Sequence, residues 1–162
     1  MAIKSIYIDF LRPMLRNRFL LHSTVISTFK GDEMSTENNK NIVIEFWRKF
    51  SAGDYSASLE MLSAEATWWV AGSTSLSGTY SKTEFAALLE QVAPLVPNGI
   101  TVTPTILTAE SDRVSVEATS YGEVTNGKTY QNIYHFMMVI ANGKITTVRE
   151  YLDTEHVTSI FG

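Results

Sequence analysis

The sequence predicts a single α+β domain in which helices cover one face of a curved antiparallel sheet. Its last third reads as a β-meander, because three runs rich in apolar and β-branched residues, 113–124, 128–140 and 144–152, are separated by Asn-Gly pairs at 126–127 and 142–143. Asn-Gly between such runs is a strong hairpin signal, since both residues tolerate the positive φ of a type I′ turn. Helical patterns come earlier in the chain, and helices followed by a meander are typical of α+β folds.

Two helices are expected at the start of the domain. Residues 37–52 carry apolar side chains at three- and four-residue spacing, which is typical of an amphipathic helix. Ser35 or Thr36 can cap this helix, and Gly53 ends it. A second, shorter helix is expected at residues 55–62.

A strand, a loop and a third helix separate this pair from the meander. The strand is expected at residues 66–70, and the loop at 71–80 is rich in Gly, Ser and Thr. Residues 81–84 read Ser-Lys-Thr-Glu, a capping box that opens the third helix. A further strand at residues 100–109 leads into the meander, and residues 156–161 are expected to form a final helical turn that Asp153 caps.

Composition excludes several classes of function. The chain has 162 residues, 44% of them hydrophobic and 19% charged, which is typical of a globular domain. A net charge of -4 without a cluster of Lys or Arg argues against nucleic acid as a partner. The absence of cysteine excludes thiolate chemistry, and His22, His135 and His156 are too scattered to predict a metal site. No apolar run approaches the roughly 20 residues of a membrane span.

Residues 1–33 are expected to form an N-terminal extension outside the fold, with the domain at 34–162. Residues 1–31 hold five basic side chains and a single acidic one, Asp9, mixed with apolar residues. A basic amphipathic segment of this kind is also typical of organellar targeting. Targeting by residues 1–33 therefore stays open as an alternative to the cytoplasmic location that we expect.

The last strand of the meander carries the candidate site. It reads Val-Arg-Glu-Tyr-Leu-Asp at residues 148–153, and charges in a sheet are costly when they are buried without partners. Side chains alternate between the two faces of a strand, so Val148, Glu150 and Leu152 share one face. In the strand before it, His135 and Phe136 fall on opposite faces.

Four segments carry a resemblance to a known family. They are residues 44–54 (IEFWRKFSAGD), 66–69 (ATWW), 127–132 (GKTYQN) and 143–153 (GKITTVREYLD). With these segments the chain resembles the SnoaL-like branch of the NTF2-like superfamily, which also contains ketosteroid isomerases and limonene-epoxide hydrolases. The resemblance implies a cone-shaped α+β barrel in which about three helices cover the concave face of the sheet. It also implies a hydrophobic pocket and a homodimer.

The resemblance assigns positions of this chain to the catalytic residues of the two enzyme groups. The general base of ketosteroid isomerases falls at Val70, their oxyanion-hole tyrosine at Phe46 and their oxyanion-hole aspartate at His135. The Asp-Arg-Asp set of limonene-epoxide hydrolases falls at Thr119, Glu117 and Glu150, and their water-orienting residues fall at Trp68 and Val70. Only Glu150 keeps a suitable carboxylate, so neither mechanism is expected to transfer as it stands.

We interpret His135, Glu150 and Glu117 as candidate catalytic residues. The resemblance places His135 and Glu150 on the concave side, where desolvation would raise the pKa of the carboxyl group. A His–Glu pair in an apolar cavity can transfer a proton, and Glu117 joins it if its strand faces inward there. The alternatives are a hydrogen-bonded core histidine, a solvated Glu117, and an ion pair of Glu150 with Arg113 or Arg149.

The function we expect is cofactor-free acid–base catalysis on a small hydrophobic molecule, of the isomerase, cyclase, dehydratase or epoxide-hydrolase type. The alternative is a non-catalytic module for binding a small ligand or for dimerisation. We expect a homodimer with no metal, no nucleic acid and no membrane partner. The expected substrate-binding residues are Phe46, Trp68, Val70, Thr119, Tyr121, Val148 and Leu152.

Overall fold

The computed structural model describes residues 35–162, so the predicted extension at 1–33 lies outside the described residues. Within the described residues, the first helix covers residues 35–51. The elements that follow are α2 (Tyr55–Glu60), β1 (Leu62–Val70), β2 (Gly78–Ser81), α3 (Lys82–Val92), a 3-10 turn (Ala93–Leu95), β3 (Thr101–Glu110), β4 (Arg113–Glu123), β5 (Thr129–Tyr130), β6 (Ile133–Ala141), β7 (Lys144–Leu152) and α4 (Thr154–Phe161).

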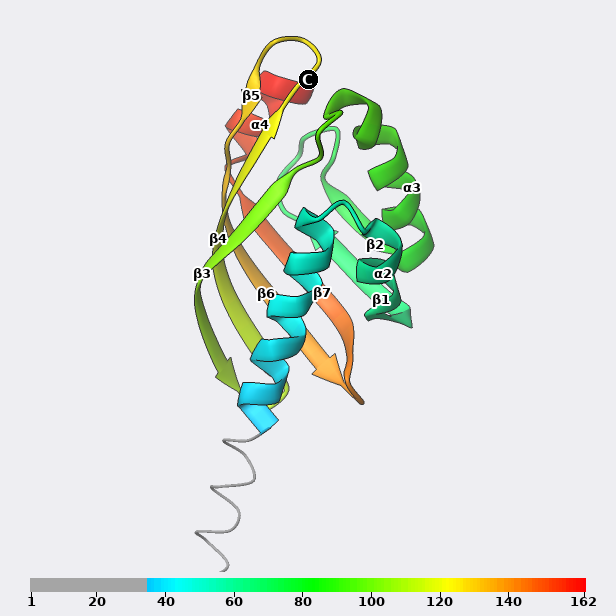
Figure 1. Ribbon diagram of the computed structural model, residues 1–162, viewed down its shortest axis with the longest axis vertical. Helices are drawn as coiled ribbons and strands as arrows, with labels where there is room; N and C mark the ends of the chain where they lie inside the picture. The colour runs from blue at the N-terminus through cyan, green and yellow to red at the C-terminus, as the bar shows by residue number, and fades with distance from the viewer. Residues whose placement is uncertain (1–34) are drawn as a thin grey trace, which may run out of the picture. The chain divides into compact units, whose positions relative to one another are not determined.

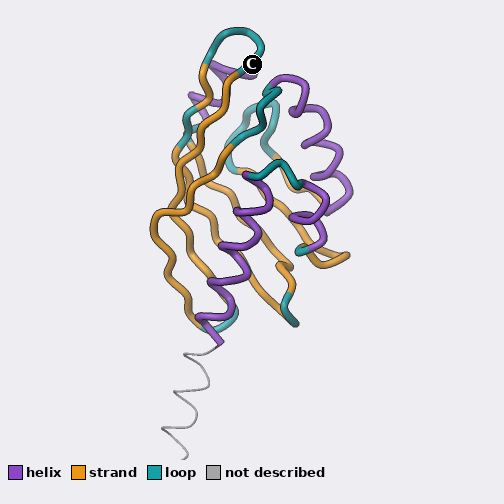
Figure 2. Tube along the Cα trace, viewed as in Figure 1, coloured by secondary structure: helices purple, strands orange, loops and turns teal. Residues whose placement is uncertain are grey.

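The strands form one sheet in the order β2-β1-β7-β6-β4-β3, with β5 paired to β4. Neighbouring strands are antiparallel except β1 and β7, which are parallel. The sheet curves in Figure 1, and the first helix, α2 and α3 lie on its inner side. Figure 2 shows the same separation of helices and strands. The predicted fold class, a curved antiparallel sheet with helices over its concave face, is confirmed.

The main hydrophobic core lies between the first helix and the inner face of the sheet. Phe46 and Trp47 of the helix are buried, as the three- and four-residue spacing predicts. Trp47 packs on Phe136 of β6 with ring centroids 4.5 Å apart, and Trp68 of β1 stacks on Phe85 of α3 at 3.9 Å. Helices and sheet are thus joined by aromatic contacts.

The predicted helix ends are confirmed at three places. Gly53 follows the first helix with a φ of +78°, which glycine adopts at little cost. The Ser81 side chain accepts from the Glu84 N–H while the Glu84 side chain accepts from the Ser81 N–H, which is the predicted capping box. The Asp153 side chain accepts a hydrogen bond from the His156 N–H at 3.0 Å and so caps α4.

Other boundaries differ from the prediction. The expected loop at residues 71–80 contains most of β2, which pairs with β1. Leu62, expected to end the second helix, begins β1 instead. The expected strand at residues 128–140 is divided into β5 and β6, because Asn132 between them is buried and bonds through its side chain to neighbouring backbone groups.

The two Asn-Gly turns are not alike. Asn142 and Gly143 have φ values of +51° and +73°, as the type I′ prediction requires. At the other turn only Gly127 has a positive φ, of +81°, and its N–H donates to the carbonyl of Val124. A three-residue loop of this kind suits a type I turn followed by a bulge, so the type I′ prediction was wrong at Asn126.

Candidate functional site

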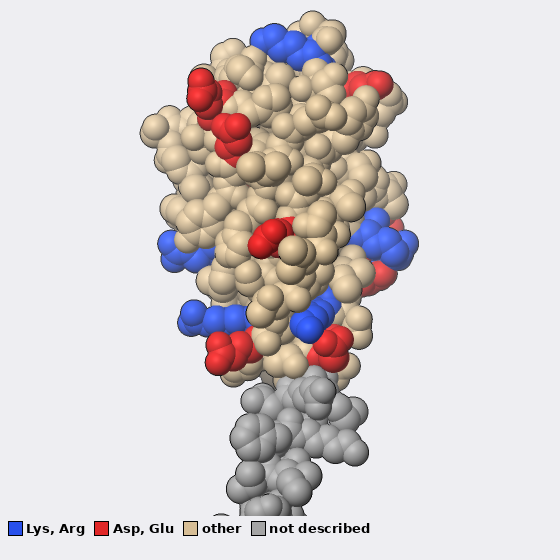
Figure 3. Space-filling model, turned by 90° about the vertical axis from the view of Figure 1, so that its left-hand side faces the viewer, with Lys and Arg blue, Asp and Glu red and all other residues tan. Residues whose placement is uncertain are grey.

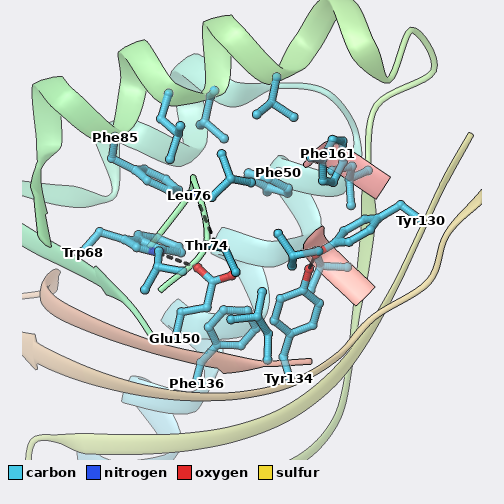
Figure 4. A pocket seen from close by; sticks show the side chains of 18 of the residues that line it. Phe50, Trp68, Thr74, Leu76, Phe85, Tyr130, Tyr134, Phe136, Glu150 and Phe161 are labelled. Carbon is cyan, nitrogen blue, oxygen red and sulfur yellow. Dashed lines mark hydrogen bonds between the residues drawn. The ribbon is translucent and has the colours of Figure 1, made fainter. Parts of the chain in front are cut away.

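A cavity of about 110 Å³ lies between the inner face of the sheet and the helices. Its wall is mainly apolar and aromatic, and Figure 4 shows the side chains that line it. The lining residues are Trp47, Phe50, Trp68, Val70, Thr74, Leu76, Phe85, Leu88, Leu89, Val92, Ile100, Val102, Tyr130, Tyr134, Phe136, Glu150, Leu152, Val157 and Phe161. A cavity of roughly 150 Å³ can take up benzene, so this somewhat smaller cavity is close in size to a single ring.

Glu150 places a carboxyl group in this apolar wall. The Trp68 Nε1–H donates a hydrogen bond of 2.6 Å to Glu150 Oε2, and the other carboxyl oxygen accepts none from the described residues. Desolvation raises the pKa of Glu150 to about 7, and the Trp68 hydrogen bond opposes this shift only in part. The alternative, an ion pair of Glu150 with Arg113 or Arg149, is not formed, and within residues 35–162 no cation contributes to the pKa of Glu150.

An irregularity between β6 and β7 decides which way Glu150 points. Regular pairing from the Asn142-Gly143 turn would continue from Ile140 opposite Ile145 and set His135 opposite Glu150. The register instead shifts after Ile140, so that Val139 pairs with residue 147. Phe136 therefore pairs with Glu150, and His135 pairs with Tyr151. One extra residue in one strand of a pair exchanges the partners of all residues beyond it.

Thr146 is the extra residue in β7. Its hydroxyl donates to the carbonyl of Val139 at 3.2 Å, which gives that carbonyl a partner at the irregularity. The bulge thus brings Glu150 to the face of Phe136, which is buried.

Two tyrosines form a second polar group in the cavity wall. Tyr130 and Tyr134 have hydroxyl oxygens 2.6 Å apart. The Asn132 Nδ2 group donates to the Tyr130 hydroxyl at 3.2 Å. Burial raises the pKa of Tyr130 to about 12 and that of Tyr134 well above its ordinary value, so both stay protonated at neutral pH. In Figure 4 the Glu150 carboxyl group lies between Trp68 and Tyr134.

Three of the predicted substrate-binding residues line the cavity: Trp68, Val70 and Leu152. Phe46 and Val148 are fully buried core residues and do not line it. Phe46 packs instead against Trp68, with ring centroids 5.9 Å apart.

The expectation that His135 lies on the concave side was wrong. His135 is exposed on the outer face of the sheet, where its Nε2 lies 2.7 Å from the Ser115 hydroxyl and its ring lies 6.0 Å from that of Tyr151. The physical reason is the bulge in β7, which separates His135 from Glu150.

The other outward residues belong to β4. Glu117 pairs with His135 and is exposed, so the alternative of a solvated Glu117 describes its position. Thr119 and Tyr121 follow on the same outer face and are exposed as well. Their neighbours Ala118 and Ser120 take the inner positions, as strand alternation requires.

The sequence prediction missed most of the aromatic wall and the hydrogen-bond network. Phe85 and Phe161 reach the cavity from helices far apart in the sequence. Tyr130, Asn132 and Tyr134 keep a two-residue spacing across the break between β5 and β6. That spacing, continued by Phe136, was the available signal that this set of residues faces inward.

Comparison with profiles of known protein families identifies the family of this chain. The profile of the SnoaL-like domain matches residues 43–148. The chain belongs to the SnoaL-like domain family. Glu150 lies two residues beyond the matched segment, so its role in this SnoaL-like domain rests on the geometry alone. A comparison with curated protein sequences found no match.

Solved structures share the NTF2-like fold of this SnoaL-like domain. An NTF2-like protein of Burkholderia xenovorans LB400 is 27% identical, with a TM-score of 0.64 over 80% of this chain and 99% of the other. Bal32a, from a soil-derived mobile gene cassette, is 18% identical, with a TM-score of 0.71 over 78% of this chain and 98% of the other. TerC, crystallised with polyporic acid, is 20% identical, with a TM-score of 0.67 over 76% of this chain and 97% of the other.

Two further findings concern residues 35–162. This part of the SnoaL-like domain contains no cluster of three or more His, Asp or Glu side chains that could hold a metal ion. Among its helices, none has both the length and the apolar content needed to cross a bilayer.

Proposed function

We propose that this SnoaL-like domain is a cofactor-free enzyme in which Glu150 transfers a proton on a small, largely apolar substrate. The observation that carries the proposal is a carboxyl group that faces an apolar cavity, has no ion-pair partner among the described residues and keeps one oxygen free of protein hydrogen bonds. An acid or base is most effective when its pKa lies near the working pH. A pKa of about 7 makes both forms of Glu150 abundant at neutral pH.

The size of the cavity favours a ligand of one ring, or one ring of a larger molecule. Its volume of about 110 Å³ and its aromatic wall suit an apolar molecule that excludes water around Glu150. TerC, which shares the fold, was crystallised with polyporic acid, so the fold accommodates a small organic ligand in that protein.

Deuterium exchange tests the proposal without a known substrate. A panel of one- and two-ring ketones is incubated with the protein in D₂O, and deuterium uptake at the carbon beside the carbonyl is followed by mass spectrometry. We expect the wild type to accelerate exchange of at least one compound, with a rate that rises as the pH passes about 7 and the Glu150 carboxylate forms. Glu150→Gln should slow this exchange by about 100-fold or more.

The control is His135→Ala, which changes a residue on the outer face. It should exchange at the wild-type rate. Full exchange in Glu150→Gln would refute the proposal. Ketones that bind in the cavity but exchange no faster than in buffer would refute catalysis and support a non-catalytic binding module.

We further propose that the outer face of the sheet forms a homodimer interface. Four large side chains on this face are exposed: Ile106 (57%), Tyr121 (47%), Ile133 (69%) and Tyr151 (41%). Exposed apolar patches of this kind often mark contacts between proteins. Figure 3 shows the corresponding side of the molecule, whose middle is largely free of charged side chains apart from one acidic side chain. A two-fold interface suits this face, because it is built from one patch that meets its own copy.

Size-exclusion chromatography with light scattering, which measures the molar mass of the protein in solution, tests the dimer. We expect the wild type to have twice the mass of one chain and Ile133→Asp to have the mass of one chain. Ile44→Asp is the control, because Ile44 is also exposed but lies on the first helix, and it should stay dimeric. A monomeric wild type, or a dimeric Ile133→Asp, would contradict the interface.

A further inference from the structure

The tyrosine pair of the cavity has one more hydrogen-bond donor than the surrounding protein can use. Tyr130 and Tyr134 each carry one hydroxyl proton, and the 2.6 Å contact between their oxygens uses one of the two. The next hydroxyl, that of Ser120, lies 3.5 Å from the Tyr134 oxygen, which exceeds the usual 2.5–3.0 Å of an O–H···O bond. Within residues 35–162, one phenolic proton is therefore left without a close acceptor.

Asn132 favours Tyr134 as the tyrosine that keeps that proton, because Asn132 donates to Tyr130. Its side-chain oxygen accepts from the backbone N–H groups of Ile133 and Asp153, at 2.8 and 3.0 Å. These bonds fix the amide so that its Nδ2 group is the end that donates to the Tyr130 hydroxyl. Either tyrosine can donate in the contact between the two hydroxyl groups; when Tyr130, which accepts from Asn132, is the donor, a chain of donors runs from Asn132 to Tyr130 to Tyr134. Such chains polarise and strengthen the last donor.

The last donor lies close to Glu150 on the same face of the sheet. Tyr134 pairs with Leu152 and Phe136 pairs with Glu150, so Tyr134 and Glu150 are diagonal neighbours on β6 and β7. Diagonal neighbours in an antiparallel pair are about 7–8 Å apart, which leaves room for ligand atoms between their functional groups. The Tyr134 ring is held in place by stacking on Phe136, with centroids 5.0 Å apart.

We propose that Tyr134 is the hydrogen-bond donor to an acceptor oxygen of the ligand, a carbonyl or the enolate formed from it, and that Tyr130 and Asn132 position its proton. Because such a donor acts only when a ligand occupies the cavity, the proposal depends on the proposed use of the cavity and specifies the chemical class of its ligand. A ligand carbonyl bound in this way would have its oxygen at Tyr134 and its neighbouring carbon toward Glu150. Burial keeps both phenols protonated well above neutral pH.

Infrared spectroscopy of a bound ketone tests the donor. The probe is acetophenone labelled with ¹³C at the carbonyl, and the reference ligand is α-methylstyrene, which has the same shape but CH₂ in place of oxygen. Both are measured at pH 8.5, where Glu150 is ionised and cannot donate while the tyrosines are protonated. Tyr134→Phe removes the donor and keeps the ring, Tyr130→Phe removes only the positioning hydroxyl, and Tyr121→Phe on the outer face is the matched control.

We expect wild-type protein to lower the carbonyl stretching frequency of bound acetophenone and Tyr134→Phe to reverse this shift. Tyr134→Phe should weaken acetophenone binding by roughly 3- to 10-fold and leave α-methylstyrene binding unchanged. Tyr130→Phe should reverse the frequency shift only in part, and Tyr121→Phe should change nothing. An unchanged frequency in Tyr134→Phe, or an equal loss of affinity for both ligands, would overturn the proposal.

Glu150→Gln separates the failure of this proposal from the failure of the proposed function. If Glu150 is not a base but Tyr134 is the donor, the variant and the wild type exchange deuterium at the same rate while both show the shifted carbonyl band. If Glu150 is the base but Tyr134 is not the donor, exchange depends on Glu150 and the band does not depend on Tyr134.

Discussion

The two faces of strands β6 and β7 place similar residue types in opposite surroundings. On the inner face, Phe136 is 1% exposed and pairs with Glu150, whose carboxyl group is desolvated. On the outer face, the next residues along each strand, His135 and Tyr151, pair with each other and are exposed. The type of a side chain therefore does not define a site: a carboxyl group becomes a candidate acid or base where the fold removes water from it.

On the outer face of the sheet, side chains from four neighbouring strands form a continuous row. Ile106, Glu117, His135 and Tyr151 are successive partners on β3, β4, β6 and β7. All four are exposed, so the imidazole and the carboxylate of this row are surrounded by water in the single chain. The sheet therefore separates a ligand cavity on one side from a candidate contact surface on the other.

The largest effect is expected on the free energy of unfolding, when an inward residue of β6 is truncated and compared with its outward neighbour. Phe136→Ala should lower the free energy of unfolding by about 3–5 kcal/mol, because it leaves a cavity among Trp47, Trp68 and Tyr134. His135→Ala should change it by no more than about 0.5 kcal/mol, as exposed positions do. Urea denaturation measures both values. Similar losses in the two variants would contradict the assignment of the faces.

A smaller effect, dependent on pH, is expected from Glu150→Gln. The pKa of Glu150 is about 7 in the fold and near 4.5 in an unfolded chain, so the fold favours the neutral acid. Its stabilising contribution is therefore complete below pH 4.5 and is lost as the pH rises to about 7. Between these pH values the wild type should lose about 3 kcal/mol relative to Glu150→Gln, with no further change above pH 8. If the free energy of unfolding changed with pH in the same way in the two proteins, the carboxyl group would be hydrated in the fold and the prediction would be wrong.

The smallest effect is expected at the hydrogen bond between Trp68 and Glu150. Trp68→Phe removes an N–H that favours the ionised carboxyl group, so the pKa of Glu150 should rise above about 7. Carbon-13 NMR of labelled glutamate carboxyl groups follows this titration. Trp69→Phe is the matched control, because Trp69 packs on Arg149 and Tyr151 instead, and it should leave the titration where it is. A lower pKa in Trp68→Phe would contradict the role of the indole.

Much of the architecture was predictable because it depends on local patterns. The apolar spacing of the first helix, the capping box at Ser81 and the Asn142-Gly143 turn all act within a few residues, and each was confirmed. The alternation that groups Glu150 with Val148 and Leu152 follows from strand geometry in the same way. The aromatic wall was less predictable, since Phe85 and Phe161 meet the cavity only after separate elements have packed together.

The meander, the helices before it and the division of each strand into two sets of side chains follow from local residue patterns. Local patterns did not determine which set of side chains in one strand lies on the same face as which set in the next strand. A single bulged residue exchanges the two sets, and it has no strong signal in the local sequence. Strand pairing in the folded domain fixes this relation at Thr146, where the shifted register turns Glu150 toward Phe136 and away from His135. The physical reason is the burial of a continuous apolar face: the sheet takes the register that places Phe136, Met138 and Val148 in the core, and Glu150 comes inward with them.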